Sequence, residues 1–322
     1  MIRLSVFGFA SLLLLTNGLF AQSIDFLPVG IFSSSLEISS SRVDSILMNR
    51  TRSESLTQRR LKVEGLDPND VSGSMSVKET TRTLRVLYGL TKSINIGINV
   101  PYRDRDRESN LLGNTPNGSL FAKKYQPAHA HGIGDIEILT LWRLNYSDYH
   151  DFLFGFSLNG DNASTNFDDD SVLPLGSGAQ ELSTWFRWKI YDDDSTLVTE
   201  ISLKTTFTKD ITIKTPSGEE LEFKKDSNLI STFFLSANRD AFHFGGGVSS
   251  IMETPTIIDG NTQGDEFISH TLTLFLTYGN LNQLESTYIQ LPMEISMYLK
   301  NTIMGDNAPA NKKIGINASL YF

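Results

Sequence analysis

Histidine is the residue type in this sequence best suited to catalysis or metal binding, and it occurs five times. His129 and His131 stand two residues apart in the segment AHAHG, whereas His150, His243 and His270 are scattered along the chain. Two histidines need further ligands to hold a metal ion, and the neighbouring sequence defines no third one. We therefore predict no metal site and no cofactor.

Hydrolytic chemistry would require a serine, a histidine and an acidic residue within hydrogen-bond reach of one another. No local motif in the sequence announces that arrangement. We therefore predict that the chain is not an enzyme and has no catalytic residues. A barrel hydrolase that depends on His129 or His243 is kept as a third hypothesis, behind the two developed below.

Charged side chains at alternate positions of otherwise apolar segments form a second set that could do chemistry. Side chains two residues apart on a strand point to the same face, so these charges share one face of a sheet. Six are basic and three are acidic: Arg85, Glu137, Arg143, Arg187, Lys189, Glu200, Lys204, Glu294 and Lys300. A hydrophilic path that favours anionic or polar solutes would have such a lining, but ion pairs that brace a closed interior would use the same residues.

The segment 84–102, LRVLYGLTKSINIGINVPY, shows the kind of element that must position these charges. Ile94, Ile96, Ile98 and Val100 alternate with small or polar residues, which is the period of a β-strand. Similar strands recur over roughly two hundred residues, and no amphipathic helix remains to cover their apolar face. The pattern therefore predicts a closed barrel whose apolar face meets lipid.

The predicted fold is all-β, a transmembrane antiparallel up-and-down β-barrel of about twelve strands. Three long polar segments are predicted as external loops, at 48–78, 103–132 and 159–178, and they alternate with short turns. Outer-membrane barrels have an even number of strands, short periplasmic turns and long external loops. The alternation therefore places both ends of the barrel on the periplasmic side.

The two ends of the sequence fit export and barrel closure. Residues 1–21 contain one basic residue, Arg3, then the apolar run VFGFASLLLL and the small residue Ala21, which is typical of a secretory signal peptide. Residues 22–322 would then form the barrel. The segment IGINASLYF, residues 314–322, alternates and predicts a last strand that pairs with the first. Its aromatic end resembles the strand by which the barrel assembly machinery recognises bacterial outer-membrane barrels.

Composition excludes other classes of protein. The 322 residues include no cysteine, so neither a disulfide framework nor thiol chemistry is available. The formal net charge of −9 leaves no basic stripe for a nucleic acid. The mean hydropathy of −0.16 is compatible with barrel strands, because these devote only alternate residues to lipid.

Three motifs resemble one known family. YGLTKSINIGINVPY at 88–102 and HGIGDIEILTLWRL at 131–144 look like the paired signatures of the outer-membrane family associated with meta-pathway phenol degradation. LPLGSGAQELSTWFRWKIY at 173–191 is similar to that family's next loop-to-strand element. Gly132, Gly134 and Asp135 match the motif GxGD, which we interpret as a tight entry into a strand and not as a binding site. The resemblance implies an outer-membrane channel for hydrophobic or small organic solutes.

We therefore expect a monomeric, porin-like barrel in the outer membrane of a Gram-negative bacterium, serving as a passive channel or transporter for small organic or polar solutes. Its expected partners are outer-membrane lipids, the barrel assembly machinery at residues 314–322 and a small-molecule solute, with no nucleic acid. The alternative hypothesis is a structural or surface-interaction barrel with a plugged lumen, whose function lies in the external loops.

Overall fold

The computed structural model describes residues 26–163, 173–194, 196–214, 220–225, 228–258, 261–263, 266–280 and 292–322. The predicted signal peptide at 1–21 lies outside these residues, and so does part of the predicted loop at 159–178. Neither of the two α-helices in the described part of the chain is long and apolar enough to span a membrane.

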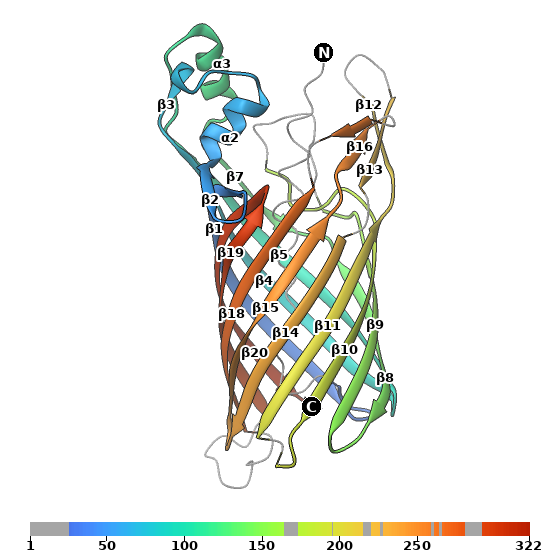
Figure 1. The fold of residues 1–322 in the computed structure, drawn as a ribbon. Helices are drawn as coiled ribbons and strands as arrows, with labels where there is room; N and C mark the ends of the chain where they lie inside the picture. Colours follow the sequence, from blue (N-terminus) through green and yellow to red (C-terminus); the bar gives the residue numbers. More distant parts are fainter. Residues whose placement is uncertain are drawn as a thin grey trace.

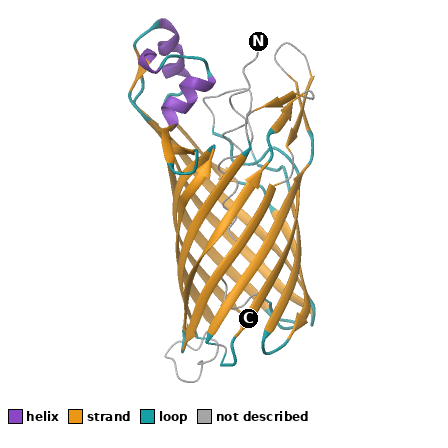
Figure 2. Cartoon of the chain, viewed as in Figure 1, coloured by secondary structure: helices purple, strands orange, loops and turns teal. Residues whose placement is uncertain are grey.

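Twelve antiparallel strands close into a barrel. Figures 1 and 2 show that the strands are inclined to its long axis. Each strand pairs with the next along the chain, which confirms the predicted up-and-down topology. The strands are β1 (Phe32–Met48), β4 (Met75–Thr91), β5 (Ile94–Ser109), β8 (Glu137–Tyr146), β9 (His150–Asn159), β10 (Glu181–Tyr191), β11 (Leu197–Thr208), β14 (Asn228–Arg239), β15 (Phe242–Glu253), β18 (Phe267–Gly279), β19 (Met293–Asp306) and β20 (Ala308–Tyr321).

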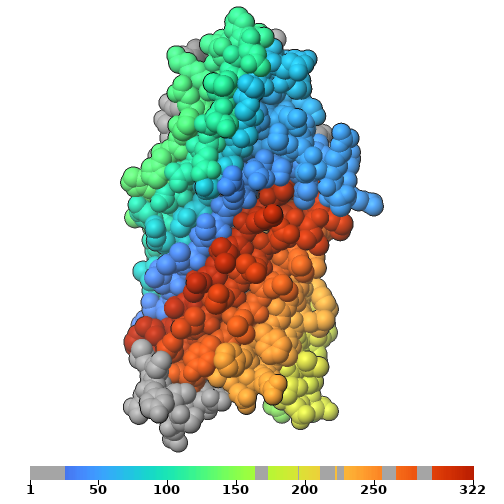
Figure 3. Space-filling model, turned by 90° about the vertical axis from the view of Figure 1, so that its left-hand side faces the viewer, coloured from blue at the N-terminus to red at the C-terminus, as the bar shows by residue number. Residues whose placement is uncertain are grey.

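The barrel closes at β1, which pairs with both β4 and β20. Leu36 stands opposite Leu84 on one side and opposite Ala318 on the other. Figure 3 shows the first strand, in blue, lying directly against the last strand, in red. Closure leaves neither strand with an unpaired edge, so the predicted pairing of the C-terminal strand with the first strand is confirmed.

The two faces of the wall differ as the alternation predicts. On β5, Ile96 and Ile98 are 40% and 37% exposed, whereas Asn95 and Asn99 between and beside them are 0% and 6% exposed. The other strands repeat this pattern, with leucine, isoleucine and phenylalanine on the outside. A continuous apolar exterior of this kind is stable in a bilayer and would be a liability in water. The outer-membrane barrel predicted from the sequence is confirmed.

The predicted loop at 103–132 is wrong over much of its length. The segment RDRDRES continues β5 to Ser109, and β7 (Ala128–Ile133) pairs with it. Only the part between them leaves the wall, where it forms β6 (Leu112–Gly113) and α3 (Pro116–Lys124). Charge alone does not indicate a loop here, because a wall that rises beyond the bilayer can carry charge on both faces.

The predicted loop at 48–78 is also more ordered than expected. It contains β2 (Arg52–Ser55), α2 (Leu56–Val63), η1 (Pro68–Asp70) and β3 (Val71–Ser72), and its last residues belong to β4. α2 and α3 bury a shared apolar cluster, to which Leu56, Leu61 and Phe121 contribute. We call this folded unit, residues 49–74 and 110–126, the cap; it stands at the long-loop end of the barrel (Figure 1).

A second small sheet also rises at the long-loop end. It consists of β12 (Ile211–Lys214), β13 (Glu220–Lys225), β16 (Thr256–Ile258) and β17 (Asn261–Gln263). β12 pairs with β13, and the turn at 215–219 between them lies outside the described residues.

Candidate functional site

The barrel interior is the candidate site, and all nine charged residues predicted for it occupy the face opposite the exposed apolar row. Arg187, Lys189, Glu200 and Glu294 are buried. The other five, Arg85, Glu137, Arg143, Lys204 and Lys300, are half-buried. Whether they line the path of a solute stays a prediction, because their position on the inner face does not by itself establish that role.

Ion pairs and hydrogen bonds link several of these residues across neighbouring strands. Lys189 Nζ lies 3.7 Å from Glu200 Oε2, and Arg143 Nε lies 3.1 Å from Asp151 Oδ1. The register places Lys189 opposite Glu200 on one side and opposite Asp151 on the other. Arg143 lies on β8, the next strand beyond Asp151, where it stands opposite Leu153 and reaches Asp151 diagonally. The short-turn half of the interior is therefore braced by charge pairs.

A second group of contacts continues around the inner wall. Arg85 Nε donates a hydrogen bond of 2.8 Å to Asn99 Oδ1, and the Asn99 amide donates in turn to Glu137. The Tyr321 hydroxyl donates to Glu294 Oε2 at 2.6 Å. The predicted residues thus belong to several local networks and do not converge on one point.

An apolar cluster narrows the short-turn end, which is the end that carries the C-terminus (Figure 1). Phe26 and Leu27, just before β1, pack inside the barrel against inward-facing residues that include Leu139 and Leu153. The guanidinium carbon of Arg143 lies 4.5 Å from the centre of the Phe26 ring. Sequence analysis does not single out this segment, although the apolar pair ahead of Pro28 is a signal that it could be buried.

Three arginines line the long-loop end of the barrel from inside, although sequence analysis places them in a loop. Arg103, Arg105 and Arg107 alternate on the inner face of β5 and are 4%, 0% and 7% exposed. We call them the arginine ladder. Arg105 also forms a buried ion pair with Glu79 on β4. The signal for the ladder was the alternation in RDRDR itself, which is the pattern of a strand with both faces charged.

The arginine ladder holds a segment of the chain within the barrel mouth. Arg103 Nη1 donates to the carbonyl of Leu175 at 3.0 Å, and Arg105 donates to the carbonyl of Pro174. We call residues 173–179 the mouth segment; its residues from Leu173 to Gly176 are all buried. The predicted external loop at 159–178 is therefore wrong for this part, because the charged donors of β5 satisfy the carbonyl groups of the segment inside the wall.

Asp135 fixes the mouth segment from the other side. Its carboxylate accepts hydrogen bonds from Ala163 N at 3.0 Å, Ser177 N at 2.6 Å and Ser177 Oγ at 3.1 Å, and the residue is 2% exposed. A Cβ atom at Gly176 would lie 2.5 Å from Asp135 Oδ1, so this close approach requires glycine. The aspartate of the GxGD motif is thus more than a strand entry, since it anchors a distant segment.

The histidines do not assemble a hydrolase site in the described part of the chain. Ser250 Oγ lies 2.8 Å from His270 Nδ1 in a cross-strand pair, but no described aspartate or glutamate hydrogen-bonds to that histidine. His243 Nδ1 contacts Asn238 Oδ1 and its ring stacks on Phe275. His129 lies on the outer wall, remote from both pairs in the barrel sheet.

Comparison with known proteins supports the architecture. No protein-family model matches the sequence, and no curated protein matches it. Among solved structures, an outer-membrane channel from Pseudomonas putida F1 superposes with a TM-score of 0.69 at 14% identity, covering 94% of this chain and 100% of the other. The transport unit of the autotransporter AIDA-I from Escherichia coli gives a TM-score of 0.49 at 9% identity, covering 100% of both chains.

A deletion mutant of TodX, described as a monoaromatic hydrocarbon channel, gives a TM-score of 0.41 at 10% identity, covering 92% of this chain and 91% of the other. At these identities the likeness concerns the fold. The resemblance to the family of meta-pathway phenol degradation stays a prediction. The chain has the fold of an outer-membrane β-barrel, and the most similar of these three structures is that of a channel.

Proposed function

We propose that this protein is an outer-membrane channel through which small organic or polar solutes pass passively, with a preference for anionic solutes. The observation that carries the proposal is the interior of the barrel, where charged side chains of both signs continue from the short-turn end to the mouth and six of the nine predicted lining residues are basic. The likeness to the channel of Pseudomonas putida F1 supports it through the fold.

The arginine ladder supports the preference for anions. Within the described structure, Arg103 Nε and Arg105 Nη2 are buried and make no hydrogen bond. A buried guanidinium N–H group without an acceptor is unfavourable, and a carboxylate oxygen is among its strongest acceptors. A solute with a carboxylate group would satisfy these donors as it enters the mouth.

The two narrow regions imply that passage depends on small movements inside the barrel. The mouth segment occupies the long-loop end, and the cluster around Phe26 occupies the short-turn end. Both are short stretches of chain held by side-chain contacts, whereas the wall is held by continuous backbone ladders. The path would therefore open by displacement of these stretches and not by deformation of the barrel.

Flux through proteoliposomes tests the proposal. The refolded barrel should accelerate entry of benzoate over protein-free liposomes, and it should accelerate entry of benzylamine, a cation of similar size, less. Arg103→Gln should reduce the ratio of the two rates. Arg82→Gln is the matched control, because Arg82 is exposed on the outer face and stands opposite Tyr102. A heat-modifiable, folded barrel that moves neither solute would contradict the proposal.

The cap favours a second candidate, a surface-interaction barrel. Val63, Leu112 and Leu120 are 54%, 68% and 67% exposed on the cap, outside the apolar band of the wall. Exposed apolar side chains at the cell surface are suited to contact with another macromolecule. Removal of residues 110–126 separates the candidates: lost adhesion of cells with unchanged flux would favour the surface role.

The proposed partners follow from this function. The apolar outer band is expected to contact outer-membrane lipids, and residues 314–322 are expected to be recognised by the barrel assembly machinery. The chain is proposed to work as a monomer, because closure within one chain leaves no strand edge to share.

A further inference from the structure

Two pairs of potential metal ligands face each other on the outer wall of the barrel. Asp104 and Asp106 lie two residues apart on β5, and His129 and His131 lie two residues apart on β7. The antiparallel register places Asp104 opposite His131 and Asp106 opposite His129. Because alternate residues share a face, all four side chains belong to one face of the sheet, opposite the arginine ladder.

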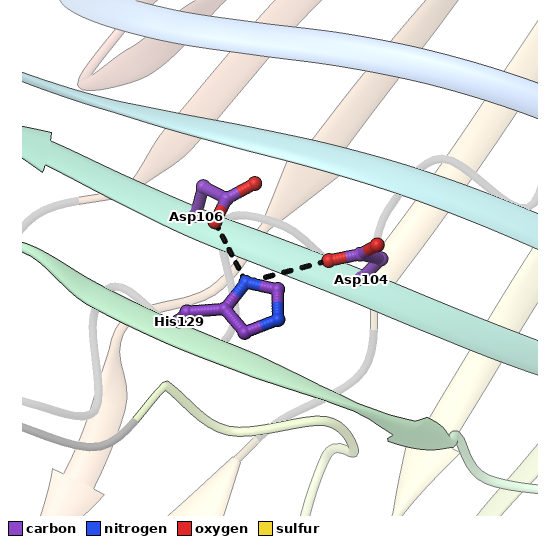
Figure 4. Close-up of side chains that lie close together, drawn as sticks. All are labelled: Asp104, Asp106 and His129. Carbon is purple, nitrogen blue, oxygen red and sulfur yellow. Dashed lines mark hydrogen bonds and ion pairs between the residues drawn. The ribbon is translucent and has the colours of Figure 1, made fainter.

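Three of the four bring their ligand atoms together, as Figure 4 shows. His129 Nδ1 lies 2.7 Å from Asp106 Oδ1 and 3.6 Å from Asp104 Oδ1. All three atoms lie within 4.8 Å of one another. Ligand atoms about 2.1 Å from a tetrahedral zinc ion are separated by about 3.4 Å, so these spacings surround the expected value.

A separate observation shows that one carboxylate oxygen of the cluster lacks a hydrogen-bond donor. Asp104 Oδ1 is shielded from solvent but accepts no hydrogen bond in the described structure. Its ion-pair contact is His129 Nδ1, the same atom that also lies against Asp106. One imidazole nitrogen cannot donate a proton to two carboxylates at once, whereas a divalent cation can bind both.

His131 is placed to orient the ligand ring. Its Nδ1 lies 3.1 Å from His129 Nε2, the ring nitrogen that points away from the two carboxylates. A histidine that binds a metal generally donates its other N–H group to a second acceptor, which fixes its tautomer and its direction. Here His131 can serve as that acceptor, and it is the only one of the four that need not touch the ion.

We propose that Asp104, Asp106 and His129 bind a divalent transition-metal ion of the Zn²⁺ class, with His131 as a positioning residue. A set of two carboxylate oxygens and one imidazole nitrogen suits zinc and leaves a fourth position for water. Calcium would need six to eight oxygen ligands, and magnesium avoids imidazole. The exposed positions of His129 and Asp106 let the ion enter from the aqueous side.

The site would attach β7 to the barrel wall. Asp104 follows Tyr102, the last residue of the outer apolar row of β5, so the ion would lie just beyond the lipid boundary. Residues 134–136 separate β7 from β8, and β7 leads directly from the cap. An ion shared by β5 and β7 would therefore hold the base of the cap, and this role is independent of the channel proposal.

Equilibrium dialysis with metal analysis tests the site in the full-length barrel, refolded in detergent without a polyhistidine tag and freed of metal with EDTA. We expect one Zn²⁺ per chain. Asp104→Asn, Asp106→Asn and His129→Gln should each abolish this binding. His131→Ala should weaken it about 10–100-fold, the loss typical of a group that orients a ligand.

Glu108→Gln is the matched control, because it removes one acidic charge from the same face of β5 outside the cluster, and it should leave Zn²⁺ binding unchanged. Hydrogen exchange gives a second readout. At a free Zn²⁺ concentration a hundred times the Kd, opening of β7 should become about a hundredfold rarer in the native chain and should not change in Asp106→Asn.

Three results would overturn the proposal: absence of stoichiometric Zn²⁺, retention of Zn²⁺ in all three ligand variants, or binding of Ca²⁺ as tight as that of Zn²⁺. Heat-modifiable migration on gels establishes that each variant is folded. The substitutions lie on the exposed outer face, and their effect on the barrel is therefore small.

Discussion

Replacing Asp135 by asparagine is predicted to open the mouth of the barrel. The Asp135 carboxylate accepts two hydrogen bonds from Ser177 of the mouth segment, at 2.6 Å from the backbone N–H and 3.1 Å from the hydroxyl, and one from Ala163. Asparagine is uncharged and presents an amide NH₂ group where one carboxylate oxygen stood. Its side chain therefore keeps one acceptor oxygen, while its NH₂ group, which is a donor, faces a hydrogen-bond donor of Ala163 or Ser177.

The structure sets the size of the effect. A hydrogen bond to a charged group contributes about 1.5–3 kcal/mol, and one to a neutral group about 0.5–1.5 kcal/mol. Both bonds from Ser177 end on Oδ2, so even an amide oxygen kept at that position weakens each of them by about 1 kcal/mol. A loss of about 2 kcal/mol changes the ratio of open to closed mouth about 30-fold. The wall is expected to keep its stability, because Asp135 lies between β7 and β8 and outside the barrel ladders.

Single-channel recording in planar bilayers measures this change as the fraction of time spent in the conducting state. Asp148→Asn is the control, since Asp148 is an exposed carboxylate in the short turn at the opposite end. The reasoning is refuted if Asp135→Asn is folded and conducts with the same open fraction as the native chain. The mouth segment would then not obstruct the path.

Three further predictions concern the wall, the short-turn end and the cap. Ile98→Arg puts a charge in the middle of the apolar row of β5. In urea titrations in liposomes it should lower the free energy of unfolding by about 2–4 kcal/mol. Leu120→Arg, on the exposed side of α3, should leave the free energy of unfolding unchanged. Alanine at both Phe26 and Leu27 should raise conductance, and an unchanged value would show that the path avoids this cluster. Burial raises the pKa of the Tyr125 hydroxyl to about 12 from its ordinary value of 10.0. Its protonated form therefore stabilises the cap below pH 10, and this stabilisation is lost as the pH rises through 12. The protection of α3 amides relative to the intrinsic, base-catalysed exchange rate should fall over that window, and Tyr125→Phe should remove this fall.

The membrane-spanning part of the fold could be predicted from the sequence because lipid imposes an uninterrupted apolar row on each strand. Ile94 to Val100 show that row directly, and the exposed side chains of Ile96 and Ile98 agree with it. This row of apolar residues ends where the strand leaves the bilayer. Beyond Tyr102 both faces of β5 are charged, so RDRDRES was assigned to a loop although it continues the strand.

The candidate sites were less predictable because they depend on contacts between distant segments. Asp135 and Ser177 lie 42 residues apart, and nothing local to either residue indicates their hydrogen bond. The third ligand beside His129 was absent from its neighbourhood in the sequence, because Asp104 and Asp106 come from the preceding strand. Register is the missing information: once β7 is paired with β5, alternation alone brings the four side chains to one face.

The most direct test of the central claim is the conductance of the native barrel in a planar bilayer with a salt gradient. A channel whose mouth is lined by the arginine ladder should show discrete conductance steps and a reversal potential displaced toward the equilibrium potential of the anion. A folded, heat-modifiable barrel that inserts but carries no current, or that selects cations, would contradict the account.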